Sequence, residues 1–249
     1  MIVRLPRTAS FALAAVVTRT TLVALRAKGL GGRWERKNHA GRTVDLYAAP
    51  AVVAGAALAA GRVRPVAGFA VLAAGACGGY DDVVGVGDPR SGFRAHLSAL
   101  RDGEVTSGAV KLFGVSAAGL VAGALLKERP VDKVLAGVVI AGAAHFVNLV
   151  DVRPGRAVGT VLALGAPGLL RRGPGAELAA AALGAAGAVL PDDFGESTML
   201  GDAGAHALGA ALGAAVVAGN GRAGLVAHAA AVVAAAVYGD KVSDLARAV

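Results

Sequence analysis

The chain has 249 residues, of which 55% are hydrophobic and only 17% are charged, and its mean hydropathy is +0.62. Soluble domains carry about a quarter charged residues, so the composition excludes an ordinary soluble domain and indicates a polytopic membrane protein. The net charge of +8 then points to cytoplasmic loops and anionic substrates, and we expect no nucleic-acid partner. The single cysteine, Cys77, excludes an internal disulfide framework and a multi-cysteine metal site.

Apolar runs recur along the whole chain. They predict an all-α membrane helical bundle of about nine transmembrane helices, forming a single integral membrane domain over residues 1–249. Glycine and alanine fill these runs, which favours helices that pack closely through small residues. The expected helices cover residues 9–24, 46–60, 66–80, 108–126, 132–150, 157–170, 177–190, 199–218 and 223–238, and residues 239–249 are expected to form a short tail.

The polar segments between these helices alternate between two faces of the bundle. Those after the first, third, fifth and seventh helices, residues 26–42, 83–107, 151–156 and 191–198, emerge on one face and include the longer loops. The positive-inside rule places that face in the cytoplasm. We therefore expect a multi-pass plasma-membrane protein whose active site faces the cytoplasm, with the amino terminus outside and the carboxyl terminus inside.

Four acidic residues lie on that face at the ends of apolar runs: Asp81, Asp82, Asp151 and Asp202. Carboxylates beside hydrocarbon are costly, so such residues are functional candidates. Clustered carboxylates repel one another unless a cation neutralises them, and Mg²⁺ prefers oxygen ligands. We therefore expect the four acids to meet and bind a divalent metal, with Lys111 nearby. Taken alone, the Asp81-Asp82 pair also fits a helix cap with a solvated neighbour, and Lys111 also fits a snorkelling surface lysine.

Other polar residues on this face fit simpler roles. Asp192, Asp193 and Glu196 are expected to form a solvated acidic loop, with extra metal ligands as the alternative. His39 lies in a loop, where it either contacts phosphate or is solvated. His206 follows the last of the four acids by one helical turn, so it is expected to line the same cleft.

Five stretches of sequence carry a family resemblance through their order and spacing. They are residues 36–43 (RKNHAGRT), 79–82 (GYDD), Lys111 within 106–111 (TSGAVK), 148–151 (NLVD) and 199–209 (MLGDAGAHALG). Together they resemble the polyprenyl-phosphate N-acetylhexosamine-1-phosphate transferases. That family includes the translocase that makes lipid I and the enzymes that begin teichoic-acid and O-antigen synthesis. The resemblance extends from about residue 31 to residue 209, and the Gly-Asp-x-Gly block at 201–204 is its most specific part.

The resemblance implies transfer of a sugar 1-phosphate from a UDP-sugar to a polyprenyl phosphate in the lipid bilayer, for cell-envelope glycan synthesis. The products would be a polyprenyl-diphospho-sugar and UMP. The resemblance also implies Mg²⁺ or Mn²⁺ as the cofactor and a homodimer as the assembly. By motif position, Asp202 and Asp81 would hold the metal, and Asp81, Asp82 and Asp151 would be catalytic. The substrate-binding positions would be Lys111, Asn148, Arg42, His39, His206 and Met199.

The chain departs from the family pattern at three positions. His145 and Pro154 replace the first asparagine and the second aspartate of an Asn-x-x-Asn-x-x-Asp-Gly-x-Asp-Gly block, and Met199 replaces an aromatic residue that can stack on uracil. Pro154, and the lack of the histidine-rich loop before the family's last helix, leave open a regulatory or binding membrane protein with altered catalysis. An ion or solute transporter is the other alternative, but the acids lie at helix ends rather than on broken midplane helices, which disfavours it.

Overall fold

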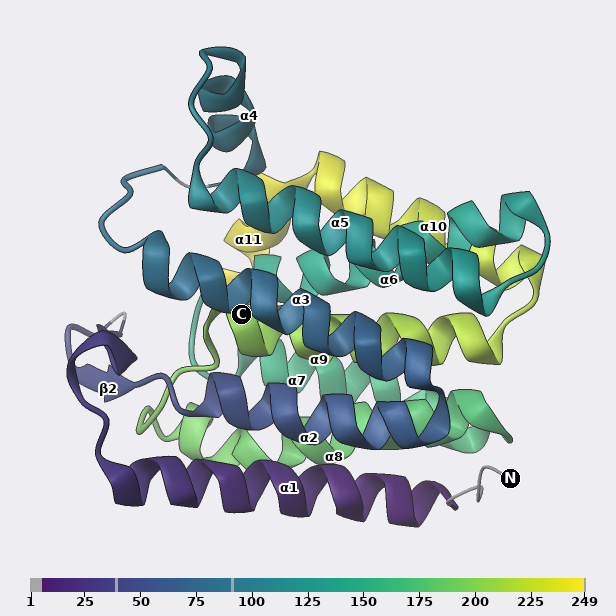
Figure 1. Ribbon diagram of the computed structural model, residues 1–249, viewed down its shortest axis with the longest axis horizontal. Helices are drawn as coiled ribbons and strands as arrows, with labels where there is room; N and C mark the ends of the chain where they lie inside the picture. The colour runs from purple at the N-terminus through teal and green to yellow at the C-terminus, as the bar shows by residue number, and fades with distance from the viewer. Residues whose placement is uncertain (1–5, 39, 91, 249) are drawn as a thin grey trace.

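The computed structural model describes residues 6–38, 40–90 and 92–248. Within these ranges the regular secondary structure is helical apart from one small hairpin, which confirms the predicted all-α class. The long helices lie side by side (Figure 1). The apolar helices are α1 (Arg7–Lys28), α2 (Ala48–Val63), α3 (Pro65–Val84), α5 (Ser107–Leu126), α6 (Pro130–Leu149), α7 (Arg156–Gly165) with the 3₁₀ helix η2 (Ala166–Leu170), α8 (Pro174–Phe194), α9 (Gly201–Gly219) and α10 (Arg222–Val237).

Length and composition identify the helices that are able to cross a membrane. Five described helices, α1, α5, α6, α8 and α9, are long and apolar enough, and α10 with the bent helix that follows it makes a sixth if the pair counts as one span. α2 and α7 with η2 are shorter apolar helices. The structure is therefore consistent with a membrane helical bundle, while nine spans and a cytoplasmic motif face stay predictions.

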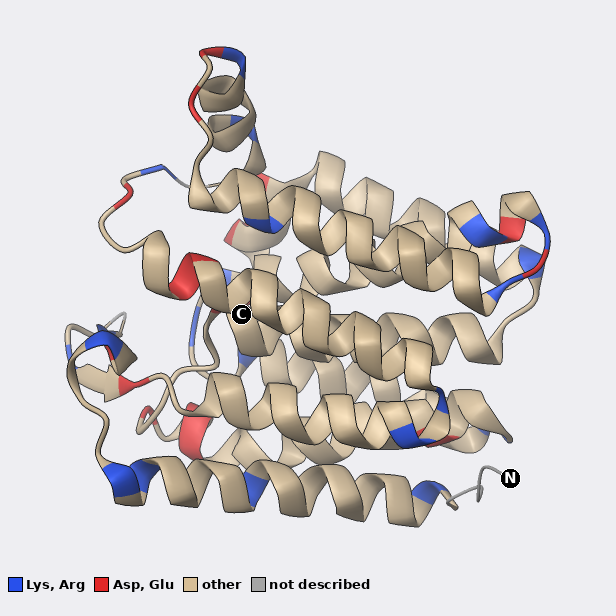
Figure 2. Ribbon diagram, in the orientation of Figure 1, with Lys and Arg blue, Asp and Glu red and all other residues tan. Residues whose placement is uncertain are grey.

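Charged residues gather at the two ends of the bundle, and the middle of the helices is nearly free of them (Figure 2). Arg19 is an exception on α1. This distribution is what a bundle embedded in hydrocarbon requires, because each charge away from the ends would need a partner. Arg19 has such a partner, since its guanidinium pairs with the Asp192 carboxylate.

Local sequence explains where several helices begin. Pro65, Pro130 and Pro174 lie in the first turn of α3, α6 and α8, where the N–H that proline lacks would be unpaired anyway. Thr106 caps α5, because its side-chain oxygen accepts a hydrogen bond from the Ala109 N–H at 3.0 Å. The apolar runs are thus separated by residues that favour helix starts.

α9 lies at the centre of the bundle, packed against α2, α3, α6 and α8, and most of its residues are buried. Small residues allow this packing, as predicted. A Cβ added to Gly209 would lie 2.4 Å from the Ala143 carbonyl oxygen of α6, so only glycine permits this approach of the two helices. Because α9 begins next to Asp202, the central helix carries one of the four predicted acids.

Two short helices were not predicted. α4 (Phe93–Arg101) forms within the polar segment and projects from the bundle in Figure 1. α11 (Gly239–Ala248) replaces the expected tail and turns by 84° from α10. Both helices are short and mix polar with apolar residues, so a search for apolar runs of membrane length misses them.

Two further segments differ from the prediction. The basic segment after α1 contains a 3₁₀ helix, η1 (Gly32–Trp34), and the antiparallel hairpin β1 (Glu35–Lys37) and β2 (Thr43–Asp45). α8 continues through Pro191 to Phe194, so Asp192 and Asp193 lie on its last turn rather than in a loop. Proline usually ends a helix, but here the carboxylates of that last turn are held by residues distant in sequence, as described below.

Candidate functional site

Three helices bring two carboxylates to one lysine. The Lys111 Nζ of α5 lies 2.5 Å from the Asp81 Oδ2 of α3 and 2.5 Å from the Asp202 Oδ2 of α9. All three side chains are largely buried, so the ammonium is an ion-pair partner and does not snorkel to the surface. Two carboxylates share a single ammonium, so one lysine alone does not balance the charge of both when both are ionised.

Two glycines allow α3 and α9 to approach closely enough for this contact. A Cβ on Gly78 would lie 2.4 Å from the Asp202 carbonyl oxygen. Gly201 opens α9 with a φ of +63°, and a Cβ there would lie 3.0 Å from the Asp82 Oδ2. The glycines beside the predicted aspartates are therefore part of how the site is built.

Asp82 holds the start of α9 in place. Its Oδ1 accepts a hydrogen bond from the Asp202 N–H and its Oδ2 accepts one from the Ala203 N–H, both at 3.0 Å. A carboxylate in this position also interacts favourably with the positive end of the helix dipole. Asp82 is thus a helix cap, which was the alternative prediction for the Asp81-Asp82 pair. The helix that it caps is α9, whereas Asp82 itself belongs to α3. Asp81 is paired with Lys111 and is not a solvated neighbour.

The hairpin of β1 and β2, which contains the motif residues 36–43, lies next to this cluster. The Arg36 guanidinium donates a hydrogen bond to the Asp82 carbonyl oxygen. The Asn38 Nδ2 donates one to the Glu196 carboxylate at 2.5 Å, and Arg42 pairs with the same carboxylate. The predicted substrate-binding residue Arg42 therefore lies at the edge of the site, where Glu196 holds it. His39 lies outside the described residues.

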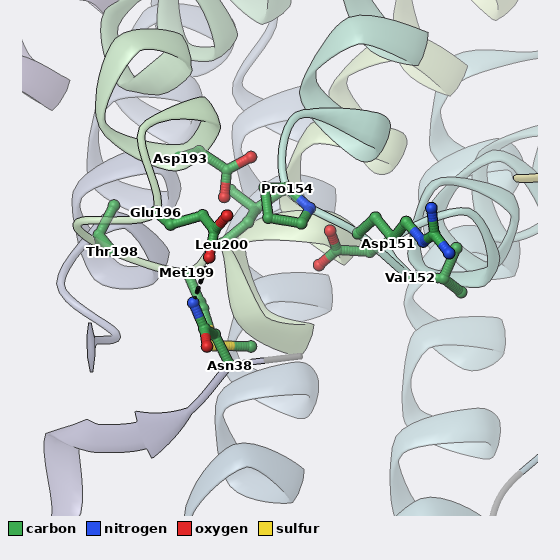
Figure 3. A pocket seen from close by; sticks show the side chains of 10 residues that line it. Asn38, Asp151, Val152, Pro154, Asp193, Glu196, Thr198, Met199 and Leu200 are labelled. Carbon is green, nitrogen blue, oxygen red and sulfur yellow. Dashed lines mark hydrogen bonds between the residues drawn. The ribbon is translucent and has the colours of Figure 1, made fainter. Parts of the chain in front are cut away.

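Asp151 lies in an adjacent cavity of about 80 Å³. Figure 3 shows its side chain beside Pro154, with Asp193 on the other side of the proline and Met199 below. The Asp151 carboxylate forms no hydrogen bond or ion pair with another described residue. Burial, together with the negative charges of Asp193, Asp202 and Asp82, raises the pKa of the Asp151 carboxyl well above its usual range.

The prediction that Asp192, Asp193 and Glu196 form a solvated acidic loop is wrong. Asp192 pairs with Arg19 and Arg26, and Asp193 is buried and accepts a hydrogen bond from the Gly155 N–H at 2.8 Å. Glu196 is held by Asn38 and adopts a φ of +54°, which is rare for a residue with a side chain. These long-range partners have no sequence signal, because ion pairs between distant segments depend on the folded arrangement.

Three predicted substrate-binding residues, Lys111, Asn148 and His206, line another cavity. It has a volume of about 300 Å³, and His145 also lines it. His206 is fully buried, and its Nδ1 lies 2.7 Å from the Asp202 carbonyl oxygen. The ring of His145 meets the ring of His206 edge-on, with centroids 5.4 Å apart. Lys111 therefore separates the carboxylates from a pocket lined by histidines, and the role of His145 as a neighbour of His206 was not predicted.

The carboxylates of Asp81 and Asp202 are the candidate ligands for a hard divalent cation. Within the described ranges, no three His, Cys, Asp or Glu side chains are arranged to hold a metal ion. Mg²⁺, however, is usually bound by one or two carboxylates, with water and substrate phosphates completing its shell. Asp81 and Asp202 supply two carboxylate oxygens around one cationic atom, so their chemistry fits such an ion.

Comparison with known proteins adds no family: no protein-family model matches the chain, and no curated protein matches its sequence.

Proposed function

We propose that the protein is a membrane-bound, metal-dependent transferase. It would move a sugar 1-phosphate from a UDP-sugar to a polyprenyl phosphate at the end of the bundle that holds Asp81 and Asp202. The observation that supports this most directly is the meeting of these two carboxylates at the Lys111 ammonium. The motif resemblance of the sequence supplies the substrate class.

In the proposed reaction, an oxygen of the polyprenyl phosphate attacks the phosphorus attached to the sugar. The new phosphorus–oxygen bond forms as the bond to the nucleotide's phosphate breaks, and UMP leaves with that electron pair. Asp81 and Asp202 would hold Mg²⁺ or Mn²⁺. When bound, that ion supplies electrostatic stabilisation of the charge that develops on the transferred phosphate and the leaving group.

The chain's own residues have distinct parts in this proposal. Lys111 pairs with both carboxylates before substrate binds, and in this proposal it contacts the substrate phosphates once a metal ion is bound by the two aspartates. Asp82 fixes α9 and with it the position of Asp202. Asp151, protonated more readily than an ordinary aspartate, is placed in a small cavity where it can exchange a proton or donate a hydrogen bond.

The test is an assay of the purified, detergent-solubilised protein with Mg²⁺, polyprenyl phosphate and a panel of radiolabelled UDP-sugars. Labelled lipid that requires the divalent ion supports the proposal. Asp202→Asn should lower the rate by about 10²–10³-fold, the usual loss when an electrostatic group at a transferring phosphate is removed. Asp244→Asn is the matched control, since Asp244 is exposed and, among the described residues, its ion-pair partner is Arg247 on the same helix, α11. Full activity of Asp202→Asn would refute the metal assignment.

A binding protein without turnover is the second candidate, and one observation favours it. Lys111 already satisfies both carboxylates, and no described group of three potential metal ligands is ready for an ion. This candidate predicts no labelled lipid across the whole panel, together with saturable binding of a UDP-sugar. Equilibrium dialysis with the same radiolabelled nucleotides distinguishes the two functions.

A further inference from the structure

An elongated cavity between α2 and α3 has no part in the proposed transfer reaction. It has a volume of about 280 Å³, at the lower end of the range for ligand pockets. On α3 it extends from Leu72 to Val83, about 16 Å at 1.5 Å per residue. Its walls are almost entirely apolar, with Pro50, Val53 and Ala76 among them.

The outer flank of this cavity faces away from the bundle. Leu72 is 56% exposed, and Phe69, about one turn before it in α3, is 48% exposed. Ala76, which lines the cavity, is also exposed. In a bundle embedded in a membrane, exposed apolar side chains along a helix contact lipid chains. The cavity is therefore a groove open to the surroundings of the helices rather than a closed core void.

One end of the groove carries a positively charged side chain. Arg33 and Trp34 of η1 line it at the charged end of the bundle. The Arg33 guanidinium forms no ion pair or hydrogen bond with any described residue, whereas Arg26, Arg36 and Arg42 at the same end all have partners. Trp34 packs against Tyr47, with ring centroids 6.4 Å apart, which fixes the indole beside the groove.

We infer that this groove binds an anionic phospholipid of the bilayer. The acyl chain lies along α2 and α3, and the phosphate lies at Arg33. An unpaired guanidinium is suited to two-point contact with phosphate oxygens, and tryptophan is enriched at the level of lipid head groups. Basic pockets between membrane helices recognise anionic head groups in this way. Asp82 also lines the groove, but its two oxygens are engaged by the backbone of α9.

The inference does not depend on the proposed transferase activity, because its test measures lipid retention. Detergent-solubilised protein is incubated with phosphatidylglycerol or with phosphatidylcholine of the same acyl chains, and bound lipid is counted by native mass spectrometry. The expected preference for phosphatidylglycerol is about fivefold, the usual contribution of one basic residue near an anionic surface. Equal retention of the two lipids would overturn the inference.

Two variants with a matched control locate the site. Arg33→Gln should bring the preference close to unity, whereas Lys37→Gln should leave it unchanged. Lys37 lies in the same hairpin region and loses the same charge, but it does not line the groove. An equal loss in both variants would assign the preference to general surface charge and contradict the groove. Ala76→Phe, at an exposed position where a larger side chain is tolerated, should lower retention of both lipids by filling the groove. Unchanged retention in Ala76→Phe would place the lipid elsewhere.

A third measurement separates a lipid from a free anion. Glycerol 1-phosphate in solution carries the head-group phosphate without an acyl chain. It should fail to displace bound phosphatidylglycerol at millimolar concentration, because the apolar walls supply most of the contact area. Displacement by glycerol 1-phosphate alone would show that the site takes a soluble anion, and the inference would be wrong.

Discussion

Gly78 of α3 lies against the Asp202 carbonyl oxygen of α9 so closely that a Cβ at position 78 would be 2.4 Å from that oxygen. No real Cβ is found at such a distance from backbone, so an alanine there forces the two helices apart. We expect Gly78→Ala to lower the free energy of unfolding by about 1–3 kcal/mol, the usual range for overpacking. The corresponding fall of several degrees in melting temperature is measurable by circular dichroism in detergent.

The matched control for that substitution is Gly187→Ala. Gly187 lies within α8, and a Cβ there would meet nothing within 4 Å. Alanine is favoured over glycine in a helix by about 0.5–1 kcal/mol, so Gly187→Ala should melt at the same temperature or slightly higher. If both variants lost stability equally, close packing at Gly78 would not be the reason.

Removing the shared ammonium should expose the repulsion between its two partners. Lys111→Met leaves the carboxylates of Asp81 and Asp202 facing each other without a cation, and breaking a buried pair in this way costs about 3–5 kcal/mol. A divalent ion would compensate in the variant, so adding Mg²⁺ should raise its melting temperature more than that of the native protein. Lys133→Met, which removes a lysine without an ion pair among the described residues, is the control. An equal response of all three proteins to Mg²⁺ would contradict the expected role of Lys111.

Asp82 should contribute to stability as the cap of α9. Asp82→Asn keeps the shape of the side chain but offers only one acceptor to the N–H groups of Asp202 and Ala203, and it removes the charge at the helix start. We expect a loss of about 1–2 kcal/mol. Asp244→Asn, at an exposed ion pair on α11, should change stability by less than about 0.5 kcal/mol. Thermal unfolding of both variants, measured side by side, checks the difference.

The raised pKa of Asp151 should make the folded protein less stable as the pH rises. Its pKa in the folded protein is raised, so the folded state keeps a proton that the unfolded state releases. Stability therefore decreases as pH rises from about 4, the ordinary aspartate pKa, through the raised value. Asp151→Asn cannot release this proton and should gain stability over the native protein progressively across that range. Melting temperatures from pH 4 to pH 9 test this, and parallel curves for the two proteins would show that Asp151 is not the titrating group.

The same residue links stability to the proposed activity. If Asp151 takes part in the transferase reaction, Asp151→Asn should be more stable at neutral pH but less active. Such opposite changes are common where a functional group is kept in an unfavourable environment. Loss of both activity and stability would indicate that the side chain mainly supports the fold.

Most of the long helices could be predicted from sequence because a single physical signal defines them. Apolar runs separated by proline, glycine and charged residues place the ends of α3, α5 and α6 within a few residues of the observed ends. Alternation of successive helices also brought Asp81 and Asp202 to the same end of the bundle, where the structure joins them through Lys111. Apolar runs and the alternating direction of successive helices are both independent of how the helices pack.

The parts that sequence did not reveal depend on contacts between distant segments. Asp192 looked like a loop residue after Pro191, but Arg19 and Arg26 hold it on the last turn of α8. Asp82 looked like a metal ligand or a cap of its own helix, and it caps α9 instead. Short amphipathic helices such as α4 are overlooked when only apolar runs of membrane length are sought.

The three residues of the ion cluster also imply an order of events during synthesis. Asp81 and Lys111 are 30 residues apart, whereas Asp202 follows Lys111 by 91 residues. A nascent chain therefore contains the first aspartate and the lysine well before α9 emerges from the ribosome. Their one-to-one pairing is electrically neutral and joins α3 to α5. The second aspartate follows later in the chain, with α9, so the pair of Asp81 and Lys111 is available as its partner.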